Sequence, residues 1–199
     1  MYTLIGNPKN RAFRVLWMLE ELGVDYDLIP ASPRSEELAA VNPSAKSPVL
    51  KVGDDHIIDS AAILQYLADK HGRFTAAAGT IERAHQDSML FFALDELDAT
   101  LWQAAKHKFI LPEELRTDAV RPALEHDFHN AMRVLETRLG DRTYATGDEF
   151  TVPDIVIGHC SGWAINARFG WPDGPLKAYS KRLRERPAYM RAHEIRLAN

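Results

Sequence analysis

The sequence predicts an α/β domain at the N-terminus followed by an all-α helical domain. Three observations predict this fold class. Residues 2–30 show a short apolar strand pattern, an amphipathic helix pattern and a second strand pattern. Residues 49–67 add two short strands around a tight Gly-Asp-Asp turn and a further helix. After residue 80 only helical spacing of apolar residues remains. The boundaries we predict are 1–72 for the α/β domain, 73–80 for a linker and 81–199 for the helical domain.

The first strand, Tyr2–Ile5, leads through a turn into a helix over Arg11–Leu22. The apolar residues of this helix recur at helical spacing and form one face, whereas Arg14 falls outside that face. Gly23 ends the helix, and Val24–Pro30 forms the next strand. Strand, helix and strand in this order predict parallel strands joined by a right-handed crossover.

A short helix over Ser35–Val41 ends at a proline. The β-branched run Val49–Val52 then turns back through His56–Ile58, which predicts an antiparallel hairpin. A further helix covers Ala61–Lys70, and Ser60 is its expected N-cap. The order of elements in the first domain is therefore β-α-β-α-β-β-α.

The helical domain is expected to have the helix Ile155–Phe169 at its centre, because that segment is apolar almost all round. Thr151 and Asp154 precede it with the spacing of a capping box, a feature of stability and folding rather than of catalysis. The other expected helices are Ile81–Lys108, Val120–Leu139, about 174–186 and Pro187–Ile195.

Composition excludes several classes of function. The net charge is −4 with no basic block, which argues against a nucleic-acid partner. No apolar run approaches the roughly 18 residues of a membrane span, and the N-terminus enters a strand directly, so we expect neither a membrane segment nor a signal peptide. The single cysteine, Cys160, cannot form an intrachain disulfide, and its apolar surroundings predict a buried structural thiol. These features together favour a cytoplasmic protein.

A metal site is not expected from the sequence. His126 and His129 are three residues apart on a predicted helix, but no third ligand is spaced to join them. A solvated pair is the preferred interpretation.

The stretch from Asn42 to Leu67 has the features of a site for a small zwitterionic peptide. Ser47 precedes Pro48 and is restricted to extended backbone, so its N–H and C=O are available to pair with an extended ligand. The helix behind Ser60 presents amides and a positive dipole end, which suit a carboxylate. Asp59 beside it suits an ammonium group. The alternative is a hairpin followed by an ordinary capped helix, because capping signals are common.

Four motifs together resemble the cytosolic glutathione S-transferase superfamily, in the right order over essentially the whole chain. The first is the opening strand with the turn and helix of residues 7–23. The second, Lys46-Ser47-Pro48, is similar to the family's cis-proline loop. The third, Asp59-Ser60-Ala61-Ala62-Ile63, is similar to its Glu/Gln-Ser-x-Ala-Ile motif. The fourth, Phe150-Thr151-Val152-Pro153-Asp154-Ile155, is similar to its folding motif. The resemblance implies a thioredoxin-like first domain.

The resemblance also implies a role for each residue of the 42–67 stretch. The main chain of Ser47 would pair with the cysteinyl part of glutathione, beside a cis bond to Pro48. Ser60 and the helix end behind it would hold the γ-glutamyl carboxylate, and Asp59 would face the ammonium group. Lys46 would reach the glycyl carboxylate.

The catalytic position falls on Asn10 by the same resemblance to the Ser and Cys classes of the family. Its NH₂ is a donor for a thiolate, although those classes use a hydroxyl or a thiol there. Asn7 is a weaker candidate. The alternative for Asn10 is that it only caps the first helix, a role that Asn fills well.

The implied function is conjugation of the glutathione thiolate to small, hydrophobic electrophilic substrates in detoxification. Glutathione is then a co-substrate, no metal takes part, and the family's usual assembly is a homodimer. The alternatives are a non-catalytic glutathione-transferase-like binding protein and a glutathione-dependent reductase or isomerase on the same scaffold.

Overall fold

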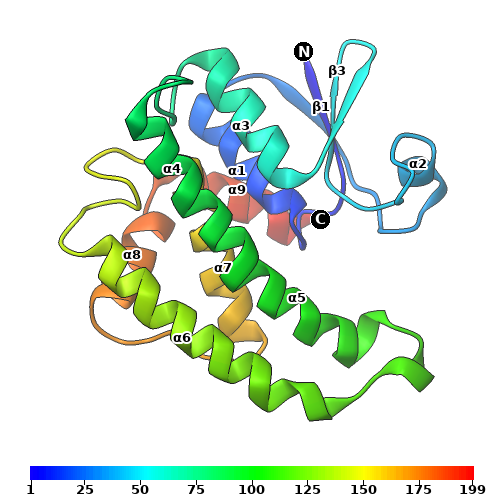
Figure 1. The fold of residues 1–199 in the computed structure, drawn as a ribbon. Coiled ribbons are helices and arrows are strands. Elements are labelled where there is room, and N and C mark those ends of the chain that lie inside the picture. The colour runs from blue at the N-terminus through cyan, green and yellow to red at the C-terminus, as the bar shows by residue number, and fades with distance from the viewer. The chain divides into compact units, whose positions relative to one another are not determined.

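A four-stranded mixed sheet forms the N-terminal part of the computed structural model, which describes all of residues 1–199 (Figure 1). The strands lie in the order β2-β1-β3-β4. The strand β1 (Tyr2–Ile5) runs parallel to β2 (Tyr26–Ile29) and antiparallel to β3 (Val49–Val52), which pairs with β4 (Asp55–Ile58). In the register, Leu4 lies opposite Leu28 on one side and Leu50 on the other. The predicted parallel pair and antiparallel hairpin are both confirmed.

Helices α1 (Ala12–Leu22) and α3 (Ser60–His71) pack against each other, and the short helix α2 (Glu36–Ala39) precedes β3. Apolar side chains from α1, α3 and the central strands are fully buried, and the order β-α-β-α-β-β-α is as predicted. Arg14 corrects the prediction that it falls outside the buried face of α1. Its side chain is fully buried, for a reason given below.

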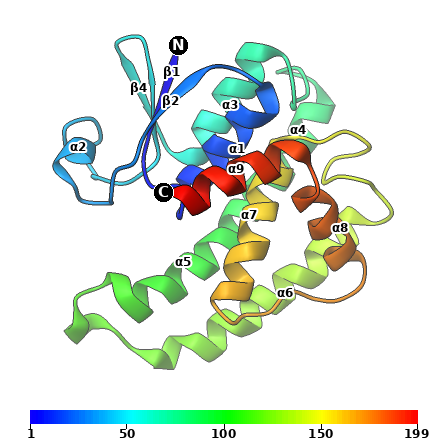
Figure 2. The ribbon, with the colours of Figure 1, turned by 180° about the vertical axis from the view of Figure 1, so that it is seen from behind.

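The chain forms two compact units, one of residues 1–78 together with 183–199, and one of residues 79–182. In the first unit, α9 (Pro187–Ala198) lies beside α1, as Figure 2 shows from behind. Glu21 accepts two hydrogen bonds from the Arg186 guanidinium, at 2.5 and 2.7 Å, and a third from Trp17 Nε1 at 2.9 Å. The predicted domain boundaries, 1–72 and 81–199 with a linker over 73–80, stay a prediction.

The unit of residues 79–182 is mostly helical. The predicted helix over Ile81–Lys108 is a continuous helical stretch with two π-helical segments, in which backbone N–H groups bond five residues back. One of these bonds joins the Ala99 N–H to the Leu94 carbonyl oxygen. The elements of the stretch are α4 (Ile81–Phe92), π-helical Ala93–Asp98, α5 (Ala99–Ala105) and π-helical Lys106–Ile110. The remaining elements are 3₁₀ turns at Glu113–Leu115 and Asp118–Val120, α6 (Arg121–Leu139), α7 (Val152–Asn166) and α8 (Pro175–Arg184).

Helix α7 contacts α4, α5 and the first π-helical segment, and most of its side chains are buried. The Asp154 carboxylate at its start accepts from the backbone N–H of Thr151 and of Ala145, both at 2.8 Å, and from the Tyr179 hydroxyl at 2.6 Å. The predicted capping box is therefore present, and the central position of α7 is confirmed. Burial is the largest influence on the Asp154 carboxyl and raises its pKa from 3.8 to about 6, while the hydrogen bonds from Tyr179 and the two amides act to lower it.

None of the helices is both long enough and apolar enough to span a bilayer.

Candidate functional site

The loop before β3 presents the first half of the site. The Ser47–Pro48 peptide bond is cis, as predicted, and Pro48 is buried. Asn42 fixes this loop from within: its Nδ2 donates to the Lys46 carbonyl oxygen at 2.7 Å, and its Oδ1 accepts from the Ser44 N–H at 3.0 Å. The Asn42 side chain is buried, so it acts on the loop rather than on a ligand. From the sequence, Asn42 begins the 42–67 stretch after a short helix, and nothing there indicates the role of its side chain.

Ser47 is half-buried at the end of this loop, with its backbone available. Neither its N–H nor its C=O pairs with another backbone group of the chain. Gly6 approaches closely from the end of β1: a Cβ added there would lie 2.8 Å from the Ser47 Cβ. Only a glycine at this position therefore allows the loop and the strand end to come so near.

Asn10 contacts Ser47 directly. Its Oδ1 accepts from the Ser47 hydroxyl at 2.9 Å and from the Ala12 N–H at 3.0 Å. Because a backbone N–H can only donate, the oxygen end of this carboxamide must face Ala12. The oxygen is then engaged by two donors, and the NH₂ end is the part of Asn10 directed to other partners. Asn10 thus bonds the first residue of α1, whose N-cap position is Arg11, and this contact uses only the oxygen of Asn10.

Ser60 forms the second half of the site, together with Arg14. The Arg14 Nη1 donates to the Ser60 hydroxyl oxygen at 3.3 Å, and both side chains are buried. The Ser60 hydroxyl is one acceptor for this buried guanidinium, which a protein interior tolerates only beside groups that accept its hydrogen bonds. The Ser60 hydroxyl proton remains available to donate to a ligand. The signal in the sequence was a single arginine within the apolar run 12–19.

Asp59, not Ser60, is the N-cap of α3, which corrects the prediction. The Asp59 carboxylate accepts from the Ala61 N–H at 2.9 Å and from the Ala62 N–H at 3.5 Å. The sequence-based prediction instead gives these amides to a ligand carboxylate. Asp59 also has a φ of 71°, which is unusual for a residue with a side chain. Strained positions of this kind persist where the surroundings fix them, and they cluster at functional sites.

The first turn of α1 connects the two halves. Asn10 and Arg14 are four residues apart, so they lie on the same side of this turn, one contacting Ser47 and the other Ser60. Four of the predicted residues (Asn10, Ser47, Pro48 and Ser60) are thus brought together by one short segment. Asp59 adjoins them through the chain.

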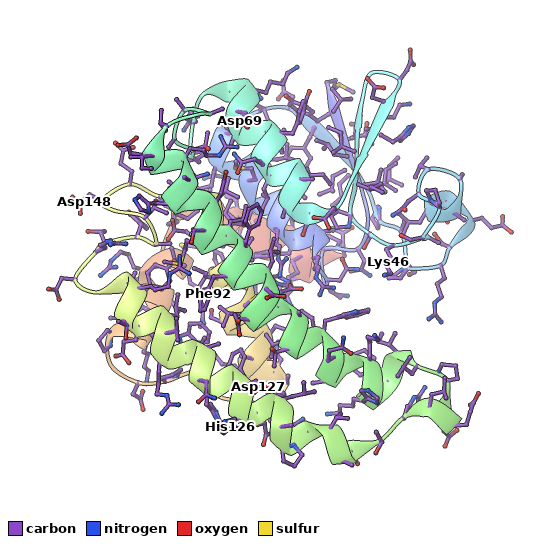
Figure 3. All side chains as sticks on the ribbon, in the orientation of Figure 1. Lys46, Asp69, Phe92, His126, Asp127 and Asp148 are labelled. Atoms are coloured by element: carbon purple, nitrogen blue, oxygen red, sulfur yellow. The ribbon has the colours of Figure 1, made fainter.

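Lys46 and Asn7 stand apart from this arrangement. Lys46 is exposed in the loop that follows α2, as Figure 3 shows. Asn7 forms the preceding turn: its Oδ1 accepts from the Lys9 N–H at 2.8 Å, and its carbonyl oxygen accepts from the Asn10 N–H at 3.1 Å. Asn7 therefore fixes the backbone of the turn that leads to Asn10.

The residues considered for metal or thiol chemistry lie in the helical unit. His126 is exposed on α6 (Figure 3). It shares a hydrogen bond of 2.9 Å with Asn130, while His129 bonds the Phe169 carbonyl oxygen at 3.1 Å. Each imidazole thus has its own partner. Cys160 is fully buried, as predicted.

Comparison with known proteins identifies the family. Residues 1–69 match the family model of the glutathione S-transferase N-terminal domain. Over 160 residues the chain is 32% identical to glutathione S-transferase 4 of Zea mays, covering 74% of this chain and 71% of the maize protein. The chain belongs to the glutathione S-transferase family.

A solved structure from this family extends the likeness to the whole chain. The glutathione transferase URE2P6 of Phanerochaete chrysosporium, in complex with oxidized glutathione, superposes with a TM-score of 0.83 at 25% identity. The superposition covers 99% of this chain and 96% of that protein. The thioredoxin-like N-terminal fold and the helical remainder are therefore those of the family.

Longer proteins carry a related segment. Elongation factor 1-gamma of Prunus avium is 26% identical over 183 residues, which is 88% of this glutathione S-transferase chain but only 41% of the plant protein. The chain thus spans about two fifths of that relative's length.

Proposed function

We propose that this protein is a glutathione transferase that conjugates the thiolate of glutathione to small, hydrophobic electrophiles. The observation that carries the proposal is the hydrogen bonding of Asn10. Its oxygen is engaged by Ser47 and Ala12, so its NH₂ is the donor presented beside the cis-proline loop. Glutathione-bound relatives such as URE2P6 support the choice of ligand.

The proposed pose places glutathione along the 47–60 region. The cysteinyl N–H and C=O pair with the backbone of Ser47, as neighbouring strands pair. The γ-glutamyl carboxylate accepts from the Ser60 hydroxyl, and the buried charge of Arg14 and the N-terminal dipole of α3 attract it. Asp59 keeps an exposed carboxylate for the ammonium group, and Lys46 meets the glycyl carboxylate at the rim.

The chemistry requires glutathione as a thiolate. A free thiol has a pKa near 8.5, and a hydrogen-bond donor beside the sulfur lowers it. In our proposal the Asn10 NH₂ is this donor, and the positive N-terminal end of α1 adds to its effect. The thiol proton passes to solvent. The thiolate then attacks the electrophilic carbon, an S–C bond forms, and with an aryl halide the halide leaves with its bonding electrons.

The protein contributes orientation and a preorganised donor, with no covalent enzyme intermediate. We further propose a homodimer located in the cytoplasm, the arrangement implied by the family resemblance. In this account the reaction needs no metal ion.

Turnover of an activated aryl halide with glutathione tests the proposal, and Asn10→Asp is the most informative variant. The aspartate keeps an oxygen for the Ala12 N–H and the Ser47 hydroxyl, but it replaces the donor with a negative charge. A hydrogen bond to a charged group contributes about 1.5–3 kcal/mol, so kcat/KM should fall about ten- to hundredfold. Asn10→Ala, which also removes the cap, serves for comparison.

The melting temperature of Asn10→Asp checks that the first turn of α1 is still stabilised, and its turnover separates capping from catalysis. If Asn10 only caps the helix, Asn10→Asp should turn over like the wild type, because aspartate caps as well as asparagine. That result would refute the assigned role. A wild-type protein that binds no glutathione would refute the whole proposal.

The second candidate is a glutathione-transferase-like module that binds glutathione or a protein partner without turnover. The match to elongation factor 1-gamma favours it, because that relative carries the related segment within a protein more than twice as long. Normal glutathione affinity combined with no turnover on a broad panel of electrophiles would favour this candidate over the first.

A further inference from the structure

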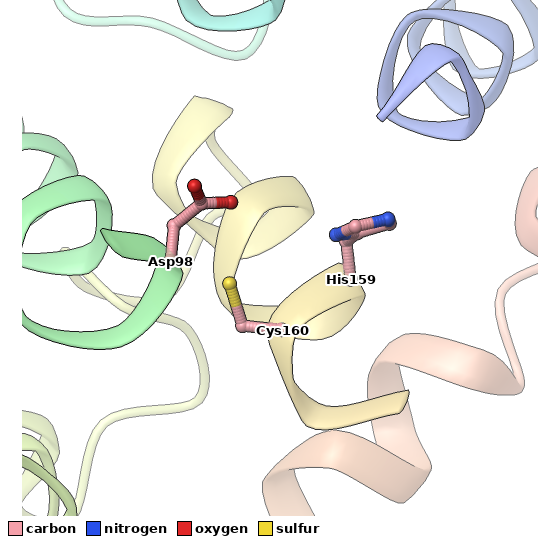
Figure 4. Close-up of side chains that lie close together, drawn as sticks. All are labelled: Asp98, His159 and Cys160. Carbon is pink, nitrogen blue, oxygen red and sulfur yellow. The ribbon is translucent and has the colours of Figure 1, made fainter. Parts of the chain in front are cut away.

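Three side chains of different metal-binding chemistry meet in the interior of the helical unit. They are Asp98, at the end of the first π-helical segment, and His159 and Cys160 of α7 (Figure 4). One carboxylate oxygen, one imidazole nitrogen and the thiol sulfur all lie within 4.8 Å of one another. Asp98 and Cys160 are buried, and His159 is half-buried.

The spacing suits a small divalent ion. Three points no more than 4.8 Å apart always have a common point within about 2.8 Å of each, which is 4.8 Å divided by √3. Zinc bonds nitrogen and oxygen at about 2.0–2.2 Å and sulfur at about 2.3 Å. Each ligand atom would thus move by less than about 1 Å, which small side-chain rotations provide.

The fold brings these residues together through two features of their helices. His159 and Cys160 are consecutive on α7, so their side chains leave the helix axis in directions about 100° apart. An ion lying between these two directions can therefore be reached from both residues. The π-helical segment Ala93–Asp98 packs against α7 and ends at Asp98. Segments of π-helix are often found at functional sites, where their extra residue per turn shifts the direction of a side chain.

The charges also favour a divalent cation. One carboxylate and one thiolate neutralise the two positive charges of the ion, so the complex adds no net charge to a buried region. Oxygen, nitrogen and sulfur donors together suit zinc, which accepts all three. The half-buried His159 marks the side open to solvent, and a water molecule there would complete four ligands.

We propose that Asp98, His159 and Cys160 form a binding site for a zinc ion. The ion replaces the contacts that these side chains now make with their neighbours, such as the edge-to-face contact of His159 with Trp163 at 6.0 Å. Binding displaces the thiol proton of Cys160, because the thiolate is the form that coordinates metal. The site lies outside the residues assigned to glutathione, and the proposal does not depend on the proposed function.

The test measures zinc bound to the untagged full-length protein, without glutathione, whose thiol would compete for metal. Dialysis against buffered zinc should leave one zinc per chain by elemental analysis, and zinc should raise the melting temperature. Cys160→Ser, Asp98→Asn and His159→Gln should each weaken zinc binding by on the order of a hundredfold. Cobalt should give a near-ultraviolet sulfur-to-metal absorption that Cys160→Ser abolishes.

His126→Gln is the matched control, because it removes an exposed histidine from α6 and should retain zinc. His159→Gln, at the half-buried position, keeps the test valid should Cys160→Ser fail to fold. The proposal is overturned if the wild type retains no zinc. It is overturned equally if the three variants bind zinc as the wild type does.

Discussion

Removing the acceptor at Asp154 should destabilise the helical unit more than any surface substitution. The Asp154 carboxylate is fully buried and accepts four hydrogen bonds, from the Ala145 and Thr151 amides and from the Thr151 and Tyr179 hydroxyls. Asparagine has nearly the same shape but only one acceptor oxygen. In Asp154→Asn the NH₂ group must therefore face at least one donor, and one backbone N–H loses its partner.

The magnitude follows from these contacts. A buried N–H left without an acceptor costs about 1–3 kcal/mol, and a lost hydrogen bond to a charged group costs about 1.5–3 kcal/mol. The two together give about 2.5–6 kcal/mol, against a total stability of about 5–15 kcal/mol for a typical domain. Tyr179→Phe removes only the hydroxyl at 2.6 Å and should cost about 1.5–3 kcal/mol.

Urea unfolding at neutral pH, followed by circular dichroism, measures both changes as shifts in midpoint at constant slope. Asp127→Asn is the control, because Asp127 is exposed on α6 (Figure 3). This substitution should change the free energy of unfolding by no more than about 0.5 kcal/mol. A cost below about 1 kcal/mol for Asp154→Asn would refute the argument that buried donors depend on this carboxylate.

Three further predictions concern pH, the glycine beside the loop and the contact of α9. Burial raises the pKa of Asp154 from 3.8 to about 6, so this carboxyl group stabilises the folded protein fully below pH 3.8, and that contribution is lost as pH rises through 6. The loss of unfolding free energy caused by Asp154→Asn should therefore be about 1 kcal/mol smaller at pH 7.5 than at pH 5. A loss that grows with pH would contradict the raised pKa of Asp154. Gly6→Ala should displace Ser47 and weaken glutathione binding at least about tenfold by calorimetry, whereas Gly53→Ala, where an added Cβ meets nothing within 4 Å, should leave the affinity unchanged. Equal affinities in the two glycine variants would contradict the role of the close approach. Glu21→Gln breaks the two-point contact with the mostly buried Arg186 and should cost about 1–3 kcal/mol in urea unfolding, while Asp173→Asn, in an exposed pair, should cost less than about 0.5 kcal/mol. Equal costs would show that the buried pair contributes no more than the exposed one.

The order of elements in the first unit was predictable because each has a strong local signal. Gly23 ends α1 in a left-handed conformation, as glycine after a helix commonly does, and the β-branched run Val49–Val52 begins at a proline. The capping box of α7 has its signal in two residues, Thr151 and Asp154. Such signals depend on neighbouring residues alone.

The N-cap of α3 could not be predicted from local sequence signals. Asp59 and Ser60 are both good N-cap residues, and only the backbone conformation, with a φ of 71° at Asp59, selects between them. The selection frees the Ser60 hydroxyl for Arg14. A residue 46 positions away therefore decides the role of Ser60, and no pattern in the 59–67 segment contains that information.

The π-helical segments have no signal in the periodicity either. The leucines at 90, 94, 97 and 101 fit an uninterrupted α-helix, and the extra residue per turn appears only when the backbone is seen. The cluster of Asp98 with His159 and Cys160 could not be predicted either, because Asp98 is about sixty residues from the other two along the chain.

The pKa of the thiol of bound glutathione reports whether Asn10 donates a hydrogen bond to the sulfur. Thiolate absorbance in the ultraviolet, followed across pH at saturating protein, reports this pKa for the wild type and for Asn10→Asp. We expect a wild-type pKa below the free value of about 8.5, and a pKa about one unit or more higher in Asn10→Asp, because a donor to the sulfur has been replaced by a negative charge. The same thiol pKa in both proteins would show that Asn10 does not act on the sulfur.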